Sequence, residues 1–327
     1  MEKSRKLIIR AALVFVCLLA LFFSLRTLIG GSGDSQTISS HKLTGNFSGN
    51  KLALVTISGP IFYSAKIIDI LEKYGKDQNI KAIVLRIDSP GGGVSACQEI
   101  VAELKKVKKK DGYNKKVVVS FGTLAASGGY YIGCYGDRIF SNPGTLTGSI
   151  GVIMENLNLE ELLNKVGVKE EVIKSGKFKD TGSSMRKMTT EERQLLQGVI
   201  DDVYAQFVDA VAEGRGAVFT ARIKKTGNTA SKDAVTKEQI VAEIKKHADG
   251  RIFSGSQALQ YGFVDELGTQ EDAVNWAAKA CGISGEPVVI TPRKEMSFLE
   301  KVFGDNSAEE RFRGIFHGNG LSYMYGK

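Results

Sequence analysis

The sequence predicts an α/β fold with a mostly parallel sheet, preceded by one transmembrane helix. Between positions 51 and 291, short β-branched runs alternate with helical stretches, a pattern typical of βαβ units. An apolar run occupies positions 7–29. The 327 residues are 43% hydrophobic and 24% charged, so the chain can bury a core and is neither disordered nor fibrous.

The apolar run at positions 7–29 is long enough to cross a bilayer, which takes about 20 helical residues. Arg10 and Arg26 lie near its ends, where long side chains reach the lipid headgroups. The basic residues of positions 1–6 predict a cytoplasmic N-terminus and an exported remainder. A cleavable signal peptide is the alternative, but no small-x-small site follows the run. We therefore expect a signal anchor, followed by a flexible Gly/Ser linker at 30–50.

The net charge of +8 does not by itself indicate nucleic-acid binding. Half of it lies in the first 30 residues, which hold five basic residues and one acidic residue. The lysines of positions 105–110 are expected to form a solvated helix face. Three histidines and four cysteines disfavour a metal centre, and no cofactor is expected. The three cysteines beyond the anchor are expected to be buried thiols: Cys97, Cys134 and Cys281.

The elements of the main domain, 51–291, follow in order. Strands are predicted by runs of Val and Ile at 51–57, 82–87, 117–121, 138–141 and 288–291. Helical periodicity predicts helices at 65–74, 95–108 and 273–280. A capping box at Thr189–Glu192 predicts a long amphipathic helix that ends near Glu213. The polar segment 216–250 is expected to be an excursion, and the tail at 292–327 carries no motif.

Two glycine-rich loops follow predicted strands. The first, SPGGG at 89–93, matches neither Walker nor GxGxxG spacing, and a tight turn is an equal interpretation. The second, Ala125–Gly129, places Ser127 on a sharp strand-to-helix turn with small neighbours, a relaxed form of the nucleophile elbow. The Gly128 N–H and an N–H of the first loop could together hold an oxyanion. Two such loops at the ends of neighbouring strands favour a nucleophilic serine.

A serine nucleophile needs a base. The histidines lie in the predicted linker, polar segment and tail (His41, His247 and His317), and only His247 stays open as a triad member. Lysine is the alternative, and IKSGKFKD at 173–180 offers Lys174, Lys177 and Lys179. A catalytic lysine must be neutral, which requires burial or nearby positive charge. Spacing alone does not choose among the three.

Three segments together resemble the signal peptide peptidase A family, membrane-anchored serine proteases related in fold to Clp protease and the crotonases. They are LRIDSPGGG, GTLAASGGYYIGCYGDRIFSNPGTLTGSIGVI and VIKSGKFKD, beginning at residues 85, 122 and 172. The resemblance covers about 51–291 and implies a Clp/crotonase-like fold with repeated ββα units. It also implies a Ser-Lys dyad in place of a triad.

The resemblance assigns a role to five residues. Ser127 falls on the nucleophile, and Lys179, which precedes Asp in the KSGxxKD motif, falls on the general base. Ser149 of the TGS segment would orient the lysine. Gly92 and Gly128 would form the oxyanion hole.

The family implies a substrate and a location. It digests remnant signal peptides and other hydrophobic peptides on the extracytoplasmic, periplasmic side of the bacterial inner membrane. The chain resembles the short, single-unit form, which implies a homo-oligomeric dome or ring whose lysine can come from a neighbouring protomer. The stretch at 217–248 is longer than the family pattern predicts. An inactive membrane scaffold, a crotonase-type acyl-transfer enzyme and a soluble Clp-like protease are the alternatives.

Overall fold

The structure is a computed structural model that describes residues 51–225, 234–292 and 322–324. The chain divides into two units, 1–46 and 47–327, and all described residues belong to the second. The predicted anchor at 7–29 and linker at 30–50 lie outside the described residues. Within those residues, no helix has both the length and the apolar character needed to cross a membrane.

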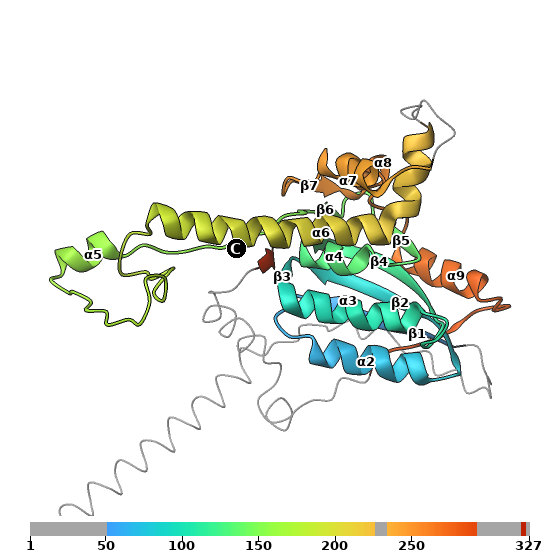
Figure 1. Cartoon of the computed structure of the whole chain (residues 1–327). Coiled ribbons are helices and arrows are strands. Elements are labelled where there is room, and N and C mark those ends of the chain that lie inside the picture. Colours follow the sequence, from blue (N-terminus) through green and yellow to red (C-terminus); the bar gives the residue numbers. More distant parts are fainter. Residues whose placement is uncertain (1–50, 226–233, 293–321, 325–327) are drawn as a thin grey trace, which may run out of the picture. The chain divides into compact units, whose positions relative to one another are not determined.

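A central sheet confirms the predicted α/β class (Figure 1). Eight strands of the described residues form it in the order β7-β6-β4-β2-β1-β9, with β5 pairing with β4 and β8. All pairs are parallel except β6 with β7, which is antiparallel. The strands are β1 Lys51–Ser58, β2 Ile80–Ser89, β4 Lys116–Ala126, β5 Arg138–Ser141, β6 Leu146–Gly148, β7 Ile252–Ser254, β8 Glu266–Leu267 and β9 Val288–Ile290.

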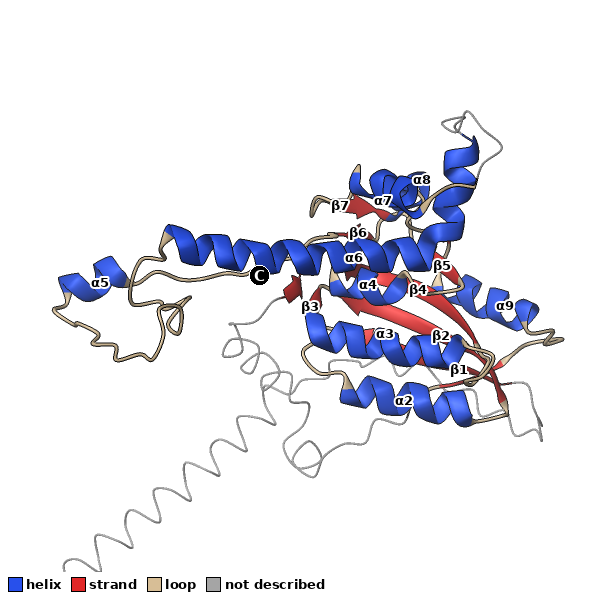
Figure 2. Ribbon diagram, in the orientation of Figure 1, coloured by secondary structure: helices blue, strands red, loops and turns tan. Residues whose placement is uncertain are grey.

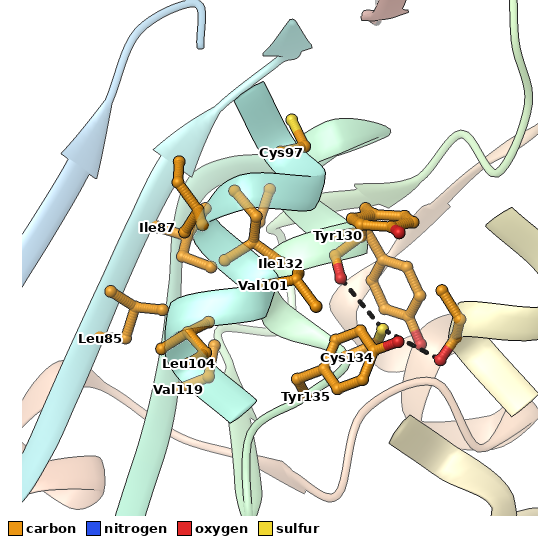
Figure 3. Close-up of a cluster of buried hydrophobic side chains, with 14 of the residues drawn as sticks. Leu85, Ile87, Cys97, Val101, Leu104, Val119, Tyr130, Ile132, Cys134 and Tyr135 are labelled. Carbon is orange, nitrogen blue, oxygen red and sulfur yellow. Dashed lines mark hydrogen bonds between the residues drawn. The ribbon is translucent and has the colours of Figure 1, made fainter. Parts of the chain in front are cut away.

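The central strands are buried on both faces, as expected for parallel strands covered by helices. Alternate residues of β2 enter different clusters: Leu85 and Ile87 join the larger cluster, whereas Ala82 and Val84 join the smaller one. The larger cluster lies under α2 (Ala65–Lys76), α3 (Val94–Lys108) and α4 (Gly128–Gly133), and Figure 3 shows part of it. The helix α9 (Gln270–Ala280) covers the opposite face.

The helix α6 (Thr190–Lys225) is 36 residues long, or about 54 Å at 1.5 Å per residue. It begins with the predicted capping box, in which Thr189 and Glu192 exchange hydrogen bonds of 2.8 and 3.2 Å. The predicted end near Glu213 is wrong. The helix continues because Arg215, Phe219 and Ile223 are buried on its inner face.

The segment predicted to be a polar excursion, 216–250, is partly helical. Its first ten residues belong to α6, and α7 (Lys237–Lys245) begins with a capping box between Thr236 and Gln239. The helix α7 packs against α6 through Ile244, which is fully buried. The short helix α8 (Gly255–Tyr261) follows β7.

Residues 153–199 form a projection that we call the arm. It contains α5 (Glu160–Lys165) and the first turns of α6, and Figures 1 and 2 show these helices reaching away from the sheet. Glu192 is the only buried residue in the arm. The arm therefore has no hydrophobic core within one chain.

The cysteines largely follow the prediction. Cys97 and Cys134 are free, buried thiols, and burial raises the pKa of each to about 12. Cys281 is free but only partly buried. The high pKa values show that Cys97 and Cys134 are not thiolate nucleophiles.

Candidate active site

Ser127 lies on a sharp turn between β4, which ends at Ala126, and α4, which begins at Gly128. Its φ of 54° and ψ of −117° are strained for a residue with a side chain, at a cost of about 1–3 kcal/mol. Two backbone hydrogen bonds of 2.8 Å hold this conformation: Ser127 N–H donates to the Gly148 carbonyl, and Tyr131 N–H donates to the Ser127 carbonyl. The fold thus holds the serine in a fixed, strained orientation.

The hydroxyl of Ser127 is buried and has no hydrogen-bond partner among the described residues. The residue is only 1% exposed. An unsatisfied buried hydroxyl costs about 1–3 kcal/mol and is rare in folded proteins. A hydroxyl of this kind on a strained turn is a candidate functional group.

The glycine loop at 89–93 lies directly beside Ser127. In the register of β2 with β4, Ser89 is paired with Ala125, so the loops that follow leave adjacent strand ends. A Cβ atom on Gly128 would lie 2.7 Å from Cys97 Sγ and 3.1 Å from Gly92 N. The fold requires glycine at position 128, because the two loops approach too closely to leave room for a Cβ atom.

Gly92 lies in the short strand β3 (Gly91–Gly93), which is bridged on one side to Ile61. Ile61 N–H donates to the Gly91 carbonyl and Gly93 N–H donates to the Ile61 carbonyl, both at 2.8 Å. A Cβ atom on Gly92 would lie 2.0 Å from the Ile61 carbonyl oxygen, so only glycine fits there. The backbones of Gly92 and Gly128 are thereby held against each other.

The other edge of β3 pairs with β10 (Ser322–Met324) in an antiparallel register that sets Tyr323 opposite Gly92. The sequence did not predict this pairing, because the tail has no periodic pattern and the partner strand is three glycines. The pairing shows that β3 can accept an extended chain along this edge.

Ser149 follows the paired end of β6, as Ser127 follows the paired end of β4. Ala126 and Gly148 are paired across these strands, so the two serines leave neighbouring strands at the same level. Ser149 is buried, has a φ of 51°, and donates its N–H to the Arg251 carbonyl at 2.8 Å. Its backbone is therefore held as firmly as that of Ser127.

The structure separates the three candidate lysines by their ion pairs. Lys174 Nζ contacts Asp180 Oδ1 at 2.5 Å, and Lys177 pairs with Glu191. Lys179 is exposed and forms no ion pair with any described residue. Lys179, the lysine that the KSGxxKD motif matches to the general base, is therefore the one of the three without a counter-ion among the described residues.

The structure does not bring Ser127 and Lys179 together within one chain. The Ser127 hydroxyl has no partner among the described residues, and Lys179 belongs to the arm. Figure 1 shows the segment between α5 and α6, which includes residue 179, beyond the first turns of α6 and away from α4.

His247 does not supply the missing base. Its ring stacks on Tyr261 with the ring centroids 4.1 Å apart and contacts Phe253 and Phe263 edge-on. Burial lowers its pKa. His247 therefore belongs to an aromatic cluster, while His41 and His317 lie outside the described residues. No group of three or more His, Cys, Asp or Glu side chains in the described ranges could hold a metal ion.

Comparisons with known proteins place this arrangement among peptidases. The profile of Peptidase family S49 matches residues 109–230 and 232–284, which include Ser127, Ser149 and Lys179. "Putative protease slr0021" of Synechocystis is 43% identical over 240 residues, 73% of this chain and 77% of its own length. "Putative signal peptide peptidase SppA" of Enterococcus faecium is 35% identical over 73% of this chain and 62% of its own length. "Putative protease MJ0651" of Methanocaldococcus jannaschii is 32% identical over 84% of this chain and 85% of its own length.

Proposed function

Because the chain belongs to peptidase family S49 and is a serine peptidase, we propose that it is a membrane-anchored endopeptidase with a Ser127–Lys179 dyad. The observation that carries this proposal is the buried, unpartnered hydroxyl of Ser127 on a strained turn beside the amides of Gly92 and Gly128. A nucleophile needs an open position next to its oxygen, and this is the position that the fold keeps free of hydrogen bonds from the described residues.

The dyad acts in two steps. Neutral Lys179 takes the proton of the Ser127 hydroxyl as the oxygen attacks the peptide carbonyl, and the resulting ammonium then protonates the leaving amine. Water, deprotonated by the same amine, hydrolyses the acyl-enzyme and restores the serine. The N–H groups of Gly92 and Gly128 hold the oxyanion, and losing one such donor typically costs about 100- to 1000-fold in rate. Ser149 orients the lysine amine.

The base comes from a second copy of the chain. The Ser127 hydroxyl has no hydrogen-bond partner among the described residues, and Lys179 lies on an arm whose own residues form no hydrophobic core. The arm also exposes most of the large apolar side chains that the described surface carries: Ile153, Leu157, Leu162, Val166, Val168, Val172, Ile173, Phe178, Met185, Leu195 and Val199. A surface of this kind on a projection favours packing against a neighbour. We therefore propose a homo-oligomer in which each arm delivers Lys179 to the next protomer.

Substrates bind as an added strand. The pairing of β10 with β3 supports this mode, because the β3 edge next to Gly92 pairs with an extended chain, and a substrate would take the place of β10 there. The name of the Enterococcus faecium relative and the apolar run at 7–29 favour hydrophobic peptides, including cleaved signal peptides. The proposal places the active site on the extracytoplasmic side of the membrane. It also assigns the fold to the Clp/crotonase type, supported by the glycine loops after β2 and β4.

Complementation between two inactive variants tests the dyad and its origin in two chains. Ser127→Ala and Lys179→Ala, each purified in detergent as the full chain, are expected to be inactive on a fluorogenic hydrophobic peptide. Mixed and reassembled, they are expected to recover activity, because a Ser127 site can then take its lysine from a Ser127→Ala neighbour. Activity in either variant alone would overturn the dyad. Two inactive variants that never complement would overturn the sharing between chains.

A further inference from the structure

The segment that carries Lys179 is fixed by charge, not by apolar packing. In residues 153–199 the only buried residue is Glu192, a glutamate whose side chain is 3% exposed. Burying a carboxylate is costly unless it is paired and hydrogen-bonded. The residue that pairs with Glu192 therefore determines the shape of this part of the arm.

Arg186 joins Glu192 to Asp180. Its Nη1 donates to Glu192 Oε2 at 2.9 Å, and its Nη2 donates to Glu192 Oε1. Its Nε donates to Asp180 Oδ2, also at 2.9 Å, and Nη2 contacts Asp180 Oδ1 at 2.9 Å. The planar guanidinium thus binds two carboxylates at once, a geometry that a lysine ammonium does not reproduce.

Both carboxylates have further partners that tie the network into the backbone. Glu192 accepts the Thr189 N–H at the start of α6, and Thr181 Oγ1 donates to it at 3.4 Å. Asp180 accepts a bond from Lys174 on the opposite side of the loop. Hydrogen bonding with Arg186 holds the pKa of Asp180 well below its usual range and lowers that of Glu192 to about 2, so both groups are charged near neutral pH.

The network connects the base to the body of the protein. Lys179 precedes Asp180 in the chain, Asp180 is held by Arg186, and Arg186 is held by Glu192 in the first turn of α6. The same helix is anchored in the core, where Arg215 pairs with Asp265 at 2.7 Å. A rigid helix therefore runs from the core to the network.

We propose that Arg186 is a positioning residue for Lys179, and that the Asp180–Arg186–Glu192 network sets where the base stands when the arm meets the neighbouring serine. This rests on the proposed role of Lys179. The nearby Lys177–Glu191 pair makes a useful contrast, because both of its side chains are more than half exposed and such pairs contribute little.

The test compares full-length variants in detergent, using a fluorogenic hydrophobic peptide and sedimentation to confirm assembly. Arg186→Gln is expected to lower kcat about 100-fold with KM within twofold, since a misplacement of about 1 Å costs that much. In its pH profile, the rise of kcat/KM (the pH limb) is expected at higher pH than in the wild type, because the displaced amine of Lys179 is more solvated. Arg186→Lys keeps the charge but loses the planar group that binds two carboxylates, and its kcat is expected to lie between those of the wild type and Arg186→Gln. Arg193→Gln, the same change at an exposed arginine on α6, is expected to match the wild type.

The outcomes separate this inference from the proposed function. If Lys179→Ala is inactive while Arg186→Gln keeps the wild-type kcat and pH limb, the positioning role is wrong and the dyad stands. If Lys179→Ala is active, the dyad itself is wrong. A fall in kcat without movement of the pH limb indicates a merely structural role and overturns the inference. Should Arg186→Gln not assemble, Asp180→Asn, which keeps the side-chain shape, decides by the same criteria.

Discussion

The carbonyl oxygen of Gly148 accepts the backbone N–H of Ser127 at 2.8 Å, and this contact joins the sharp turn at Ser127 to the end of β6. Gly148 has a φ of 81°, and Ser127 and Ser149 also have positive φ angles. Three residues with positive φ therefore meet where β4 and β6 end, and the two serines among them are strained. Strain of this kind persists only where the surroundings fix the backbone, and it gathers at functional sites.

Gly148→Ala is expected to destabilise the protein by about 2 kcal/mol or more. The left-handed backbone alone costs about 1–2 kcal/mol for a residue with a Cβ, and the added atom would lie 2.5 Å from the Phe253 ring. Urea unfolding measures the change. Gly144→Ala is the control, because a Cβ there meets no atom within 4 Å. Equal stability of the two variants would show that the turn is not under this constraint.

Gly92→Ala is expected to lower the rate of Ser127 labelling by a fluorophosphonate at least 100-fold, because a displaced β3 removes the oxyanion donor that we propose at Gly92. The new Cβ would lie 2.0 Å from the Ile61 carbonyl oxygen, so β3 must move. Gly93→Ala is the matched change, since its Cβ would be 3.7 Å from the same oxygen, and a loss of less than tenfold is expected. Similar losses in both variants would contradict the specific role of Gly92.

Arg215→Met is expected to destabilise the protein by about 3 kcal/mol, because it leaves the largely buried carboxylate of Asp265, 11% exposed, without its cation. Arg215 is 3% exposed and donates two hydrogen bonds to Asp265, at 2.7 and 2.9 Å. Lys105→Met, which breaks the exposed pair with Glu213, is expected to cost less than about 1 kcal/mol. Chemical denaturation of both variants checks the difference, and a cost below 1 kcal/mol for Arg215→Met would contradict the prediction.

The stability that Glu192 gains from Arg186 is expected to depend on pH in the acid range. The folded pKa is about 2 and the ordinary value 4.5, so the folded state favours the charged form. The contribution is therefore complete above about pH 4.5 and is lost as the pH falls toward 2. Urea unfolding of the wild type and Arg186→Gln at pH 7, 4 and 3 measures it. The difference between them should be largest at pH 7, smaller at pH 4 and smaller again at pH 3, and a difference independent of pH would contradict this account.

Local patterns predicted five strands of the sheet (β1, β2, β4, β5 and β9) and the sharp turn at Ser127, because runs of β-branched residues and small residues are encoded by neighbours in the sequence. They missed β6, β7 and β8, which are only two or three residues long. They did not predict the continuation of α6 past Glu213, since that depends on a salt bridge between Arg215 and Asp265, 50 positions apart. The pairing of β10 with β3 could not be predicted, because three glycines carry no strand pattern. Spacing could not choose among the lysines of KSGKFKD either, because Lys174 and Lys177 differ from Lys179 only in their ion-pair partners.

The empty hydrogen-bonding position at Ser127 has a consequence for when the protein works. If the base arrives only from a neighbour, a single protomer does not cleave the peptides around it, and proteolysis begins at the concentration at which protomers assemble. Specific activity should then rise steeply with protein concentration and level off once assembly is complete. Assembly itself would then act as the switch that activates the enzyme.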